Sequence, residues 1–361
     1  MRRRILLLIT DLEIGGTPTV LRELALRLRN VPDVHVQAAG LSGPGPLRDQ
    51  LLARGIECTA LGARGAWDLK IAGKLHRLLR RERIDTVVSF LIHANALAAA
   101  LRSAYPHARY FQSIQTTQPR PAWHWALERW VHRAAEKIFV PSLSVATVAQ
   151  RWAGVSASKI VIIPNAIDPA EFRGGTGGPP VNREHGRATH ADIGFIGRLD
   201  PIKRIPDLLH AMTLLPANMR LHIFGEGGEQ RRIEADVKQL GLGGRVIMHG
   251  AIARPQEALA MIDLLVLPSE AEGFGLVLIE AMASGVPVVA TNVAGIRDVV
   301  SDGRTGLLVP ARSPERLGKA IARMIDEPGL RQRLIENALT DVNRRFTWEA
   351  VFPKYLRLFD L

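Results

Sequence analysis

The sequence has few of the residues that mark several protein classes. A single cysteine, Cys58, stands among 361 residues; it excludes an internal disulfide and a cysteine-rich metal site, and it fits a reducing cytoplasm. Aromatic residues make up only 5% of the chain, and no recognised nucleic-acid-binding motif occurs. The longest apolar runs, such as residues 5–9 and 286–290, are too short to span a bilayer.

The first residues resemble a signal peptide only superficially. Three arginines precede the apolar run at 5–9, but Asp11, Glu13 and two glycines follow it where a cleavage site would stand. A first β-strand is the better interpretation.

Acidic residues are scarce in the first half only. The net charge is +12, and residues 1–170 hold 23 Lys and Arg against 12 Asp and Glu, whereas residues 171–361 hold 24 against 23. This asymmetry indicates that the first half meets an anionic partner: a phospholipid surface, a phosphorylated acceptor or a nucleic acid. A solubilising arginine-rich surface is an equal alternative.

Two predicted helices carry much of that charge. The segment 68–83 has six cations on a dense basic face. The segment 122–137 combines Trp123, Trp125 and Trp130 with three cations. Tryptophan with arginine on a helix suits a membrane interface, and packing of the tryptophans in the core is the alternative.

Hydrophobic patterns predict strands that alternate with helices, with no hairpin signals between them. In the first half we expect strands at 4–9, 34–39, 56–61, 86–90, 109–113, 137–141 and 160–163. In the second half we expect strands at 192–196, 220–224, 245–249, 264–267, 286–290 and 306–309. Such alternation predicts two α/β domains, each a parallel sheet covered on both faces.

The pattern breaks once, in a stretch rich in glycine and proline. We therefore predict an N-terminal Rossmann-like domain at 1–168, a linker at 169–190, a C-terminal Rossmann-like domain at 191–342 and a last helix at 343–361 that crosses back to the first domain.

One stretch of the second half predicts a binding site. A loop with two glycines, Gly273 and Gly275, runs into an apolar segment of helical length, so backbone N–H groups can face an anion at a helix N-terminus. Glu272 and Glu280 bracket this loop at a spacing of eight residues. N–H groups for phosphate and carboxylates for hydroxyls suit a nucleotide sugar; a plain strand-to-helix turn with surface glutamates is the alternative.

Other candidate polar groups also follow predicted strands. They are the Gly15-Gly16 pair, His93, and Arg198 with Lys203. Two facing parallel-sheet domains bind ligands at the carboxyl ends of their strands. Together Arg198 and Lys203 can neutralise a diphosphate without a metal.

These residues give the second half a close resemblance to retaining glycosyltransferases of family 4, which have the GT-B fold. The resemblance is strong over residues 192–310, where two glutamates stand eight apart. The matching segments are 195–199 with Lys203, 224–227, 246–250, 268–269, 272–276, 280–288, Gly295, 302–303 and 306–309. It is weaker in the first half, where Gly15-Gly16, 164–165 and 167–168 match.

The resemblance implies roles for individual residues. Glu280 would hold the ribose hydroxyls of the donor, and Glu272 would lie beside the donor sugar at the reacting centre. Arg198 and Lys203 would bind the diphosphate and stabilise its charge as it leaves. His93 stands where such enzymes often have a histidine that contacts the sugar; a polar residue at a strand end is the alternative.

The resemblance also implies a set of backbone contacts to the donor. The N–H groups of the loop would meet the sugar and the diphosphate, and four glycines would let the chain approach the substrate. These positions are Gly273, Phe274, Gly275, Leu276, Val277, Gly15, Gly16, Gly197 and Gly225. One departure limits this transfer, because Thr17-Pro18-Thr19 follows Gly16 where relatives commonly have a small residue and an acid.

We therefore predict transfer of a sugar, with retention at the anomeric carbon, from a UDP- or GDP-sugar to a glycan, lipid-linked or other cell-envelope acceptor. No cofactor and no metal are expected. The basic first domain would hold the acceptor and meet an anionic membrane surface, which places the protein in the cytoplasm at the inner face of the membrane. We expect no specific nucleic acid.

Two other classes of function remain as alternatives. One is a nucleotide-sugar epimerase with the GT-B fold, which would change the donor without any acceptor. The other is a non-catalytic basic protein that binds polyanions. The intact glutamate pair, with Arg198 and Lys203, argues against a decayed enzyme.

Overall fold

We describe the protein from a computed structural model at residues 3–65, 68, 70–118, 121–172, 191–252 and 254–361. The chain divides into two compact units: unit 1 is Met1–Asn165 with Val351–Leu361, and unit 2 is Ala166–Ala350. Most of the predicted linker, residues 173–190, lies outside the described residues; its start holds a short 3-10 helix at Pro169–Glu171.

Unit 1 is a seven-stranded parallel sheet in the order β3-β2-β1-β4-β5-β6-β7. Its strands are β1 (Arg3–Ile9), β2 (Val34–Gly40), β3 (Cys58–Ala60), β4 (Thr86–Phe90), β5 (Arg109–Ser113), β6 (Lys137–Val140) and β7 (Ile160–Ile162). Its helices are α1 (Gly16–Leu28), α2 (Pro46–Ala53), α3 (Lys70–Arg81), α4 (Ile92–Leu101), α5 (Ala122–Val131), α6 (Leu143–Ala153) and α14 (Trp348–Phe359).

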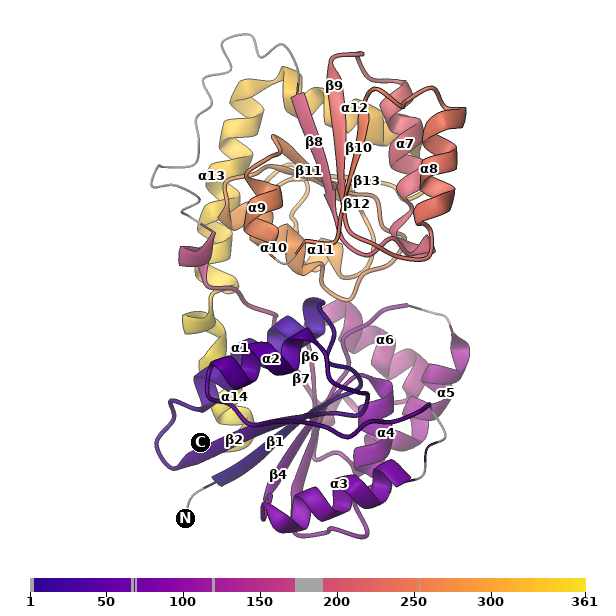
Figure 1. Ribbon diagram of the computed structural model, residues 1–361. Helices are drawn as coiled ribbons and strands as arrows, with labels where there is room; N and C mark the ends of the chain where they lie inside the picture. The colour runs from indigo at the N-terminus through magenta and orange to yellow at the C-terminus, as the bar shows by residue number, and fades with distance from the viewer. Residues whose placement is uncertain (1–2, 66–67, 69, 119–120, 173–190, 253) are drawn as a thin grey trace. The chain divides into compact units, whose positions relative to one another are not determined.

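The helices of unit 1 form two layers on the sheet (Figure 1). The first layer contains α1 and α2; the second contains α3, α4, α5 and α6. Buried side chains of β1, α3 and α4, among them Leu6, Leu75 and Ala98, make one core cluster, and α5 and α6 share another. The outer side of each layer is therefore left to polar residues and solvent.

Helix α14 returns to unit 1 although it ends the chain. Phe359 packs edge-on against Phe111 of β5 with ring centroids 5.2 Å apart, and Tyr355 packs against Phe139 of β6 at 5.6 Å. Arg109 binds the carboxylate of Asp360 at 2.9 Å. The prediction that the last helix crosses back to the first domain is confirmed.

Unit 2 is a six-stranded parallel sheet in the order β10-β9-β8-β11-β12-β13. Its strands are β8 (Ala191–Ile196), β9 (Met219–Phe224), β10 (Val246–Gly250), β11 (Leu264–Leu267), β12 (Val288–Thr291) and β13 (Leu307–Val309). Its helices are α7 (Ile205–Thr213), α8 (Gln230–Gln239), α9 (Pro255–Leu259), α10 (Leu276–Ala283), α11 (Ile296–Val299), α12 (Pro314–Asp326) and α13 (Pro328–Arg345).

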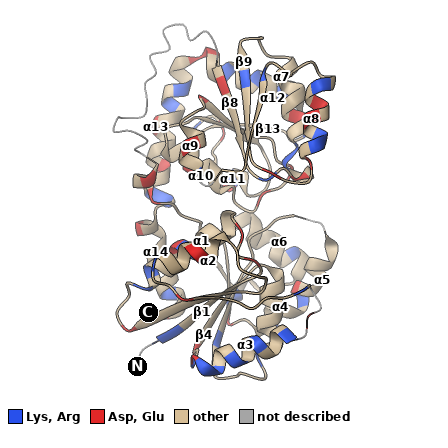
Figure 2. Cartoon of the chain, in the orientation of Figure 1, with Lys and Arg blue, Asp and Glu red and all other residues tan. Residues whose placement is uncertain are grey.

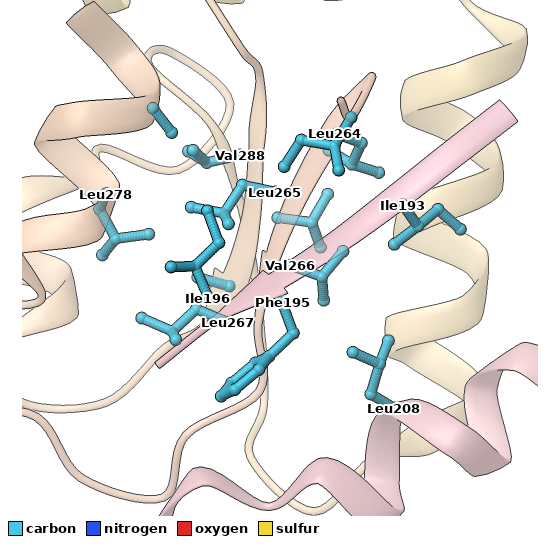
Figure 3. Packing of buried hydrophobic residues seen from close by; sticks show 14 of the residues in the cluster. Ile193, Phe195, Ile196, Leu208, Leu264, Leu265, Val266, Leu267, Leu278 and Val288 are labelled. Carbon is cyan, nitrogen blue, oxygen red and sulfur yellow. The ribbon is translucent and has the colours of Figure 1, made fainter. Parts of the chain in front are cut away.

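The core of unit 2 centres on β8 and β11, which are buried along their whole length. Figure 3 shows Ile193 and Phe195 of β8 beside Leu264 and Val266 of β11, with Leu208 of α7 near them. Strands buried on both faces read as continuous apolar runs, which is why the sequence predicted them well. The α/β class and the two Rossmann-like parallel sheets are confirmed.

Candidate functional site

The order of strands reverses direction at one place in each sheet. The reversal lies between β1 and β4 in unit 1, and between β8 and β11 in unit 2. In open parallel sheets, ligands bind at the carboxyl ends of the strands at such a switch point. Gly15-Gly16 and His93 follow β1 and β4, at the starts of α1 and α4, and Lys203 and Glu272 follow β8 and β11.

The switch point of unit 2 brings Lys203 and Glu272 into contact. Lys203 Nζ lies 2.5 Å from Glu272 Oε1, and the two side chains are 17% and 11% exposed. Ser269, which is fully buried, donates its hydroxyl to the same Oε1 at 2.8 Å. Bonds to an ionised acceptor are short and strong, so this oxygen is held firmly from two sides.

Two further residues fix the backbone of Ser269 and Glu272. The hydroxyl of Thr291, at the end of β12, donates to the carbonyl of Ser269 at 2.5 Å. Gly295 has φ 86°, and a Cβ there would lie 2.2 Å from the carbonyl oxygen of Glu272. Only glycine therefore lets the start of α11 close onto the Glu272 loop.

The loop after Glu272 ends at the N-terminus of α10. Gly275 is the N-cap in a left-handed conformation, φ 78°, so the helix begins at Leu276. The N–H groups of Leu276 and Val277 belong to the first turn, where intrahelical acceptors are missing. Phe274 is buried against Phe346 with ring centroids 5.5 Å apart, which anchors the loop to the core. The backbone therefore presents donors suited to an anion.

Glu280 lies one turn further along α10 and is buried. Burial, and to a smaller extent the nearby charge of Glu171, raises the pKa of its carboxyl from 4.5 to about 7. A carboxyl with this pKa changes its charge near neutral pH. Its ability to accept hydrogen bonds therefore depends on pH.

The second cation of the site is much more exposed. Arg198 follows Gly197 at the end of β8, and its side chain is 72% exposed. Its Nη2 pairs with the carboxylate of Asp200 at 2.9 Å. The structure therefore brings Lys203 to Glu272, whereas the contact that it shows for Arg198 is to Asp200 within the same loop.

Two predicted glycines meet where β8 and β9 end. Gly225 has φ 144°, and a Cβ there would lie 1.9 Å from the carbonyl oxygen of Gly197. The N–H of Gly197 donates to the carbonyl of Phe224 at 3.0 Å, and the N–H of Gly225 donates to that of Gly250 at 2.7 Å. The close approach of these backbones by itself requires glycine at 225.

The switch point of unit 1 holds the remaining candidates. Gly15 is the N-cap of α1 and Gly16 its first residue, where a Cβ would meet no atom within 4 Å. His93, at the start of α4, has ring contacts with Trp123 and His124, each at 5.8 Å between centroids. Burial and the neighbouring His93 lower the pKa of His124. Gly16 therefore has room towards the outside, and His93 belongs to a cluster of rings.

The sequence reasoning did not assign roles to Ser269, Thr291, Gly295 or His124. Ser269 and Gly295 stand in the segments that carry the family resemblance, so a signal for them existed. Thr291 directly follows the predicted strand at 286–290, and His124 lies within a predicted helix. Their partners lie far along the chain, and only the folded sheet shows them.

The described residues contain neither a cluster of metal-ligating side chains nor a helix that could span a membrane. No group of three or more His, Cys, Asp or Glu in the described part of the chain could hold a metal ion. Within the same ranges, none of the helices has the length and apolar character needed to cross a membrane.

Two family models match this chain, and together they cover most of its length. Residues 14–171 match the family model described as Glycosyltransferase Family 4, and residues 182–341 match the model described as Glycosyl transferases group 1. The chain belongs to glycosyltransferase family 4. The resemblance seen in the glutamate and glycine segments is thereby confirmed.

Curated relatives of this family-4 chain carry different names. It is 29% identical over 234 residues to the glycogen synthase of Mycobacterium tuberculosis, covering 63% of this chain and 54% of the relative. It is 30% identical over 256 residues to the D-inositol 3-phosphate glycosyltransferase of Acidothermus cellulolyticus, covering 67% and 56%. The chain thus spans about half the length of the curated relatives it matches.

Solved structures confirm the GT-B fold for this family-4 chain. The Anabaena protein HepE, solved in complex with UDP and glucose, has a TM-score of 0.89 at 21% identity, with 99% of each chain covered. The sucrose-phosphate synthase of Thermosynechococcus elongatus has a TM-score of 0.82 at 22% identity, with 99% of this chain and 98% of that chain covered.

Proposed function

We propose that the protein transfers a sugar, with retention at the anomeric carbon, from a nucleotide diphosphate sugar to an acceptor hydroxyl. One observation carries the proposal. At the switch point of unit 2, a partly buried Lys203–Glu272 pair is fixed by Ser269 next to the N-terminus of α10. This arrangement offers a cation and N–H groups to a diphosphate and a carboxylate to a sugar.

We assign the donor to unit 2. The N–H groups of Leu276 and Val277 would bind the diphosphate together with Lys203 and Arg198, and those of Gly273, Phe274 and Gly275 the sugar hydroxyls. Glu280 would accept hydrogen bonds from the ribose. The glycines at 197 and 225, and those at 15 and 16, would let the backbone approach the donor.

In the proposed reaction, the bond between the anomeric carbon and the diphosphate oxygen breaks. A bond from the acceptor oxygen to the same carbon forms on the same face, and the acceptor proton passes to the leaving phosphate. Lys203 and Arg198 stabilise the negative charge of that phosphate, and Glu272 stabilises the positive charge that develops on the sugar. Glu272 is not a covalent nucleophile in this scheme.

For the donor we propose a UDP-sugar, with a GDP-sugar as the second choice. HepE, which shares the fold, was solved with UDP and with UDP-glucose. For the acceptor we propose a glycan or lipid-linked sugar of the cell envelope, held by unit 1. His93 would contact the sugar that is transferred. The protein would act in the cytoplasm at the inner face of the membrane. The names of the relatives indicate different acceptors, so family membership alone leaves this choice open.

A donor panel with two variants tests the proposal. UDP-, GDP- and ADP-sugars are compared by thermal shift, and transfer is measured with the donor that stabilises most. Glu272→Ala should lower kcat about a hundredfold or more, because the charge that it provides acts in the transition state.

The matched control is Glu270→Ala. Glu270 is a neighbouring carboxylate whose side chain pairs with Arg312 at 2.6 Å, and its loss should leave kcat within about twofold. Full activity in Glu272→Ala, or a product of inverted anomeric configuration, would rule the mechanism out. Epimerisation of the donor without an acceptor would favour the epimerase.

A further inference from the structure

The positive charge of unit 1 is concentrated on one of its two helix layers. Helices α3, α4 and α6 contain no Asp or Glu, and the single acidic residue of α5, Glu128, is buried. The exposed cations of this layer and of the turn after α5 are Lys70, Lys74, Arg77, Arg80, Arg81, Arg129, Arg133 and Arg151. Figure 2 shows Lys and Arg along α3.

The other layer has mixed charges that neutralise each other. On α1, Glu23 pairs with Arg22 at 3.0 Å and with Arg27 at 2.6 Å. On α2, Asp49 lies 3.6 Å from Arg48. The excess charge of the first half is therefore not a general solubilising coat. Helices α1 and α2 hold their own carboxylates, whereas α3 holds none, and among the described residues the ion pair of its arginines is that of its last residue, Arg81, with Glu82 beyond the helix at 2.7 Å.

The same basic layer exposes large apolar side chains. Within the described ranges, both exposed tryptophans lie on α5: Trp123 is 51% exposed and Trp130 is 69% exposed. They stand seven residues apart, which places them on one face of the helix. Leu143, at the start of α6, is 63% exposed. Trp125 points the other way and is buried against Trp152 at 5.2 Å.

Arginine accompanies the outer tryptophan. The guanidinium of Arg133 lies over the ring of Trp130 at 4.5 Å from its centroid. Tryptophan rings prefer the headgroup level of a bilayer, and arginine and lysine beside them meet lipid phosphates. A folded nucleic acid or a soluble polyanion would use the charges but gain little from exposed indole and leucine.

We propose that the outer side of the α3–α6 layer, which we call the basic layer face, docks on an anionic phospholipid bilayer. Cations of α3 lie against the lipid headgroups, and Trp123, Trp130 and Leu143 enter the interface. The docking rests on unit 1 and needs no property of the donor site. It adds to the proposed function a surface that would hold the enzyme where a lipid-linked acceptor is found.

The basic layer face also leads to the switch point of unit 1. Trp123 lies at the start of α5, where its ring is 5.8 Å from that of His93 and 4.1 Å from that of His124. One end of the docking face therefore contacts His93, the residue of unit 1 that is proposed to contact a sugar. An acceptor anchored in the bilayer would have a short path to His93.

Vesicle flotation with the full chain tests the docking. Vesicles of phosphatidylcholine alone are compared with vesicles that also contain phosphatidylglycerol, at low and at high salt. Binding is expected only with phosphatidylglycerol and should fall as salt rises. The triple variant Lys70→Gln, Arg77→Gln, Arg80→Gln should weaken binding roughly a hundredfold, since each cation near an anionic surface contributes about fivefold.

A matched charge control lies in unit 2. Lys238→Gln, Arg316→Gln, Lys319→Gln removes the same three charges from exposed positions of α8 and α12 and should leave binding within about threefold. An equal loss in both triple variants would show that only net charge matters, which would overturn the docking face.

The tryptophans separate a bilayer from other polyanions. Trp123→Ala with Trp130→Ala should weaken vesicle binding about tenfold or more but leave binding to heparin, a soluble polyanion, unchanged. Leu214→Ala, at a side chain of unit 2 that is 59% exposed, is the control. Full vesicle binding by the tryptophan variant would overturn the proposal in favour of a polyanion site. UDP binding is measured on every variant and should stay unchanged. Failure of the docking proposal can therefore be distinguished from failure of the donor assignment.

Discussion

At the scale of single residues, the position of the Glu272 carboxylate depends on hydrogen bonds from neighbouring side chains. Glu272 Oε1 accepts from both Lys203 and Ser269. Lys203 neutralises the carboxylate, whereas the hydroxyl of Ser269 mainly fixes its position. These are different contributions, and kinetics can separate them.

Ser269→Ala should lower kcat for transfer about tenfold while the donor KM changes less than threefold. The hydroxyl donates to a charged group, and such bonds typically contribute about 1.5 to 3 kcal/mol. Steady-state kinetics with the preferred donor measures both constants. Ser269→Thr, which keeps the hydroxyl, should recover part of kcat.

Ser284→Ala serves as the comparison for that experiment. Its hydroxyl donates at 3.0 Å to the carbonyl of Glu280 within α10, not to a carboxylate of the site, so kcat should hardly change. If Ser269→Ala keeps the full kcat, Ser269 does not position Glu272.

At the scale of elements, α10 combines two opposite requirements. Its first turn presents N–H groups to an anion, while its second turn buries the carboxyl of Glu280. Burial disfavours the ionised form, which is the form that accepts hydrogen bonds from two ribose hydroxyls. The ionised carboxyl therefore lowers the stability of the fold, but it is the form that would bind the ribose of the proposed donor.

This conflict predicts a pH dependence of stability. The pKa of Glu280 is raised from 4.5 to about 7, so between these values the folded protein binds more protons than the unfolded chain, and stability falls as pH rises. At pH 8, the free energy of unfolding of Glu280→Gln should therefore exceed that of the wild type by about 3 kcal/mol. At pH 4, the two free energies should be equal. Urea unfolding at several pH values measures the difference.

Ligand binding should respond in the opposite sense. The same Glu280→Gln variant should bind UDP about tenfold or more weakly at pH 8, because an amide accepts fewer hydrogen bonds from the ribose than a carboxylate. Glu315→Gln, at an exposed position in the first turn of α12, should change neither quantity. Equal stability of Glu280→Gln and wild type at every pH would contradict the burial argument.

At the scale of the whole molecule, the chain leaves unit 1 after β7, builds unit 2, and returns to unit 1 with α14. The aromatic contacts of this helix, to Phe111 of β5 and Phe139 of β6, cover two strands between the centre and one edge of the sheet. The last residues of the chain therefore complete the core of the unit that contains its first residues.

Phe359→Ala should destabilise unit 1 by about 3 kcal/mol or more, because it removes a fully buried aromatic ring that packs against Phe111 of β5. Limited proteolysis should then cut unit 1 faster, while the thermal shift expected from the proposed binding of UDP to unit 2 remains. Leu356→Ala, at a half-buried position of the same helix, should cost less. If the thermal shift with UDP disappears when unit 1 is destabilised, the two units do not unfold separately.

Much of this architecture was readable from the sequence, because buried parallel strands are continuous apolar runs and glycine loops follow them. Gly273, Gly275, Glu272 and Glu280 stand within nine residues, so their local pattern was enough to suggest a donor site. Trp125 was different: the sequence grouped it with Trp123 and Trp130, and only the packing of α5 on α6 decided which rings face outwards.

The strands and helices, the glycine loop between Glu272 and Glu280 and the basic character of the first half follow from local sequence patterns. Tertiary structure alone decided that Lys203 meets Glu272, because β8 and β11, far apart in the chain, become neighbours where the order of strands reverses. It also decided that the basic charge occupies one helix layer, since the crossovers of the sheet place α3 to α6 together. Contacts of this kind depend on which strands pair, and strand pairing is set by the whole sheet, not by any one segment.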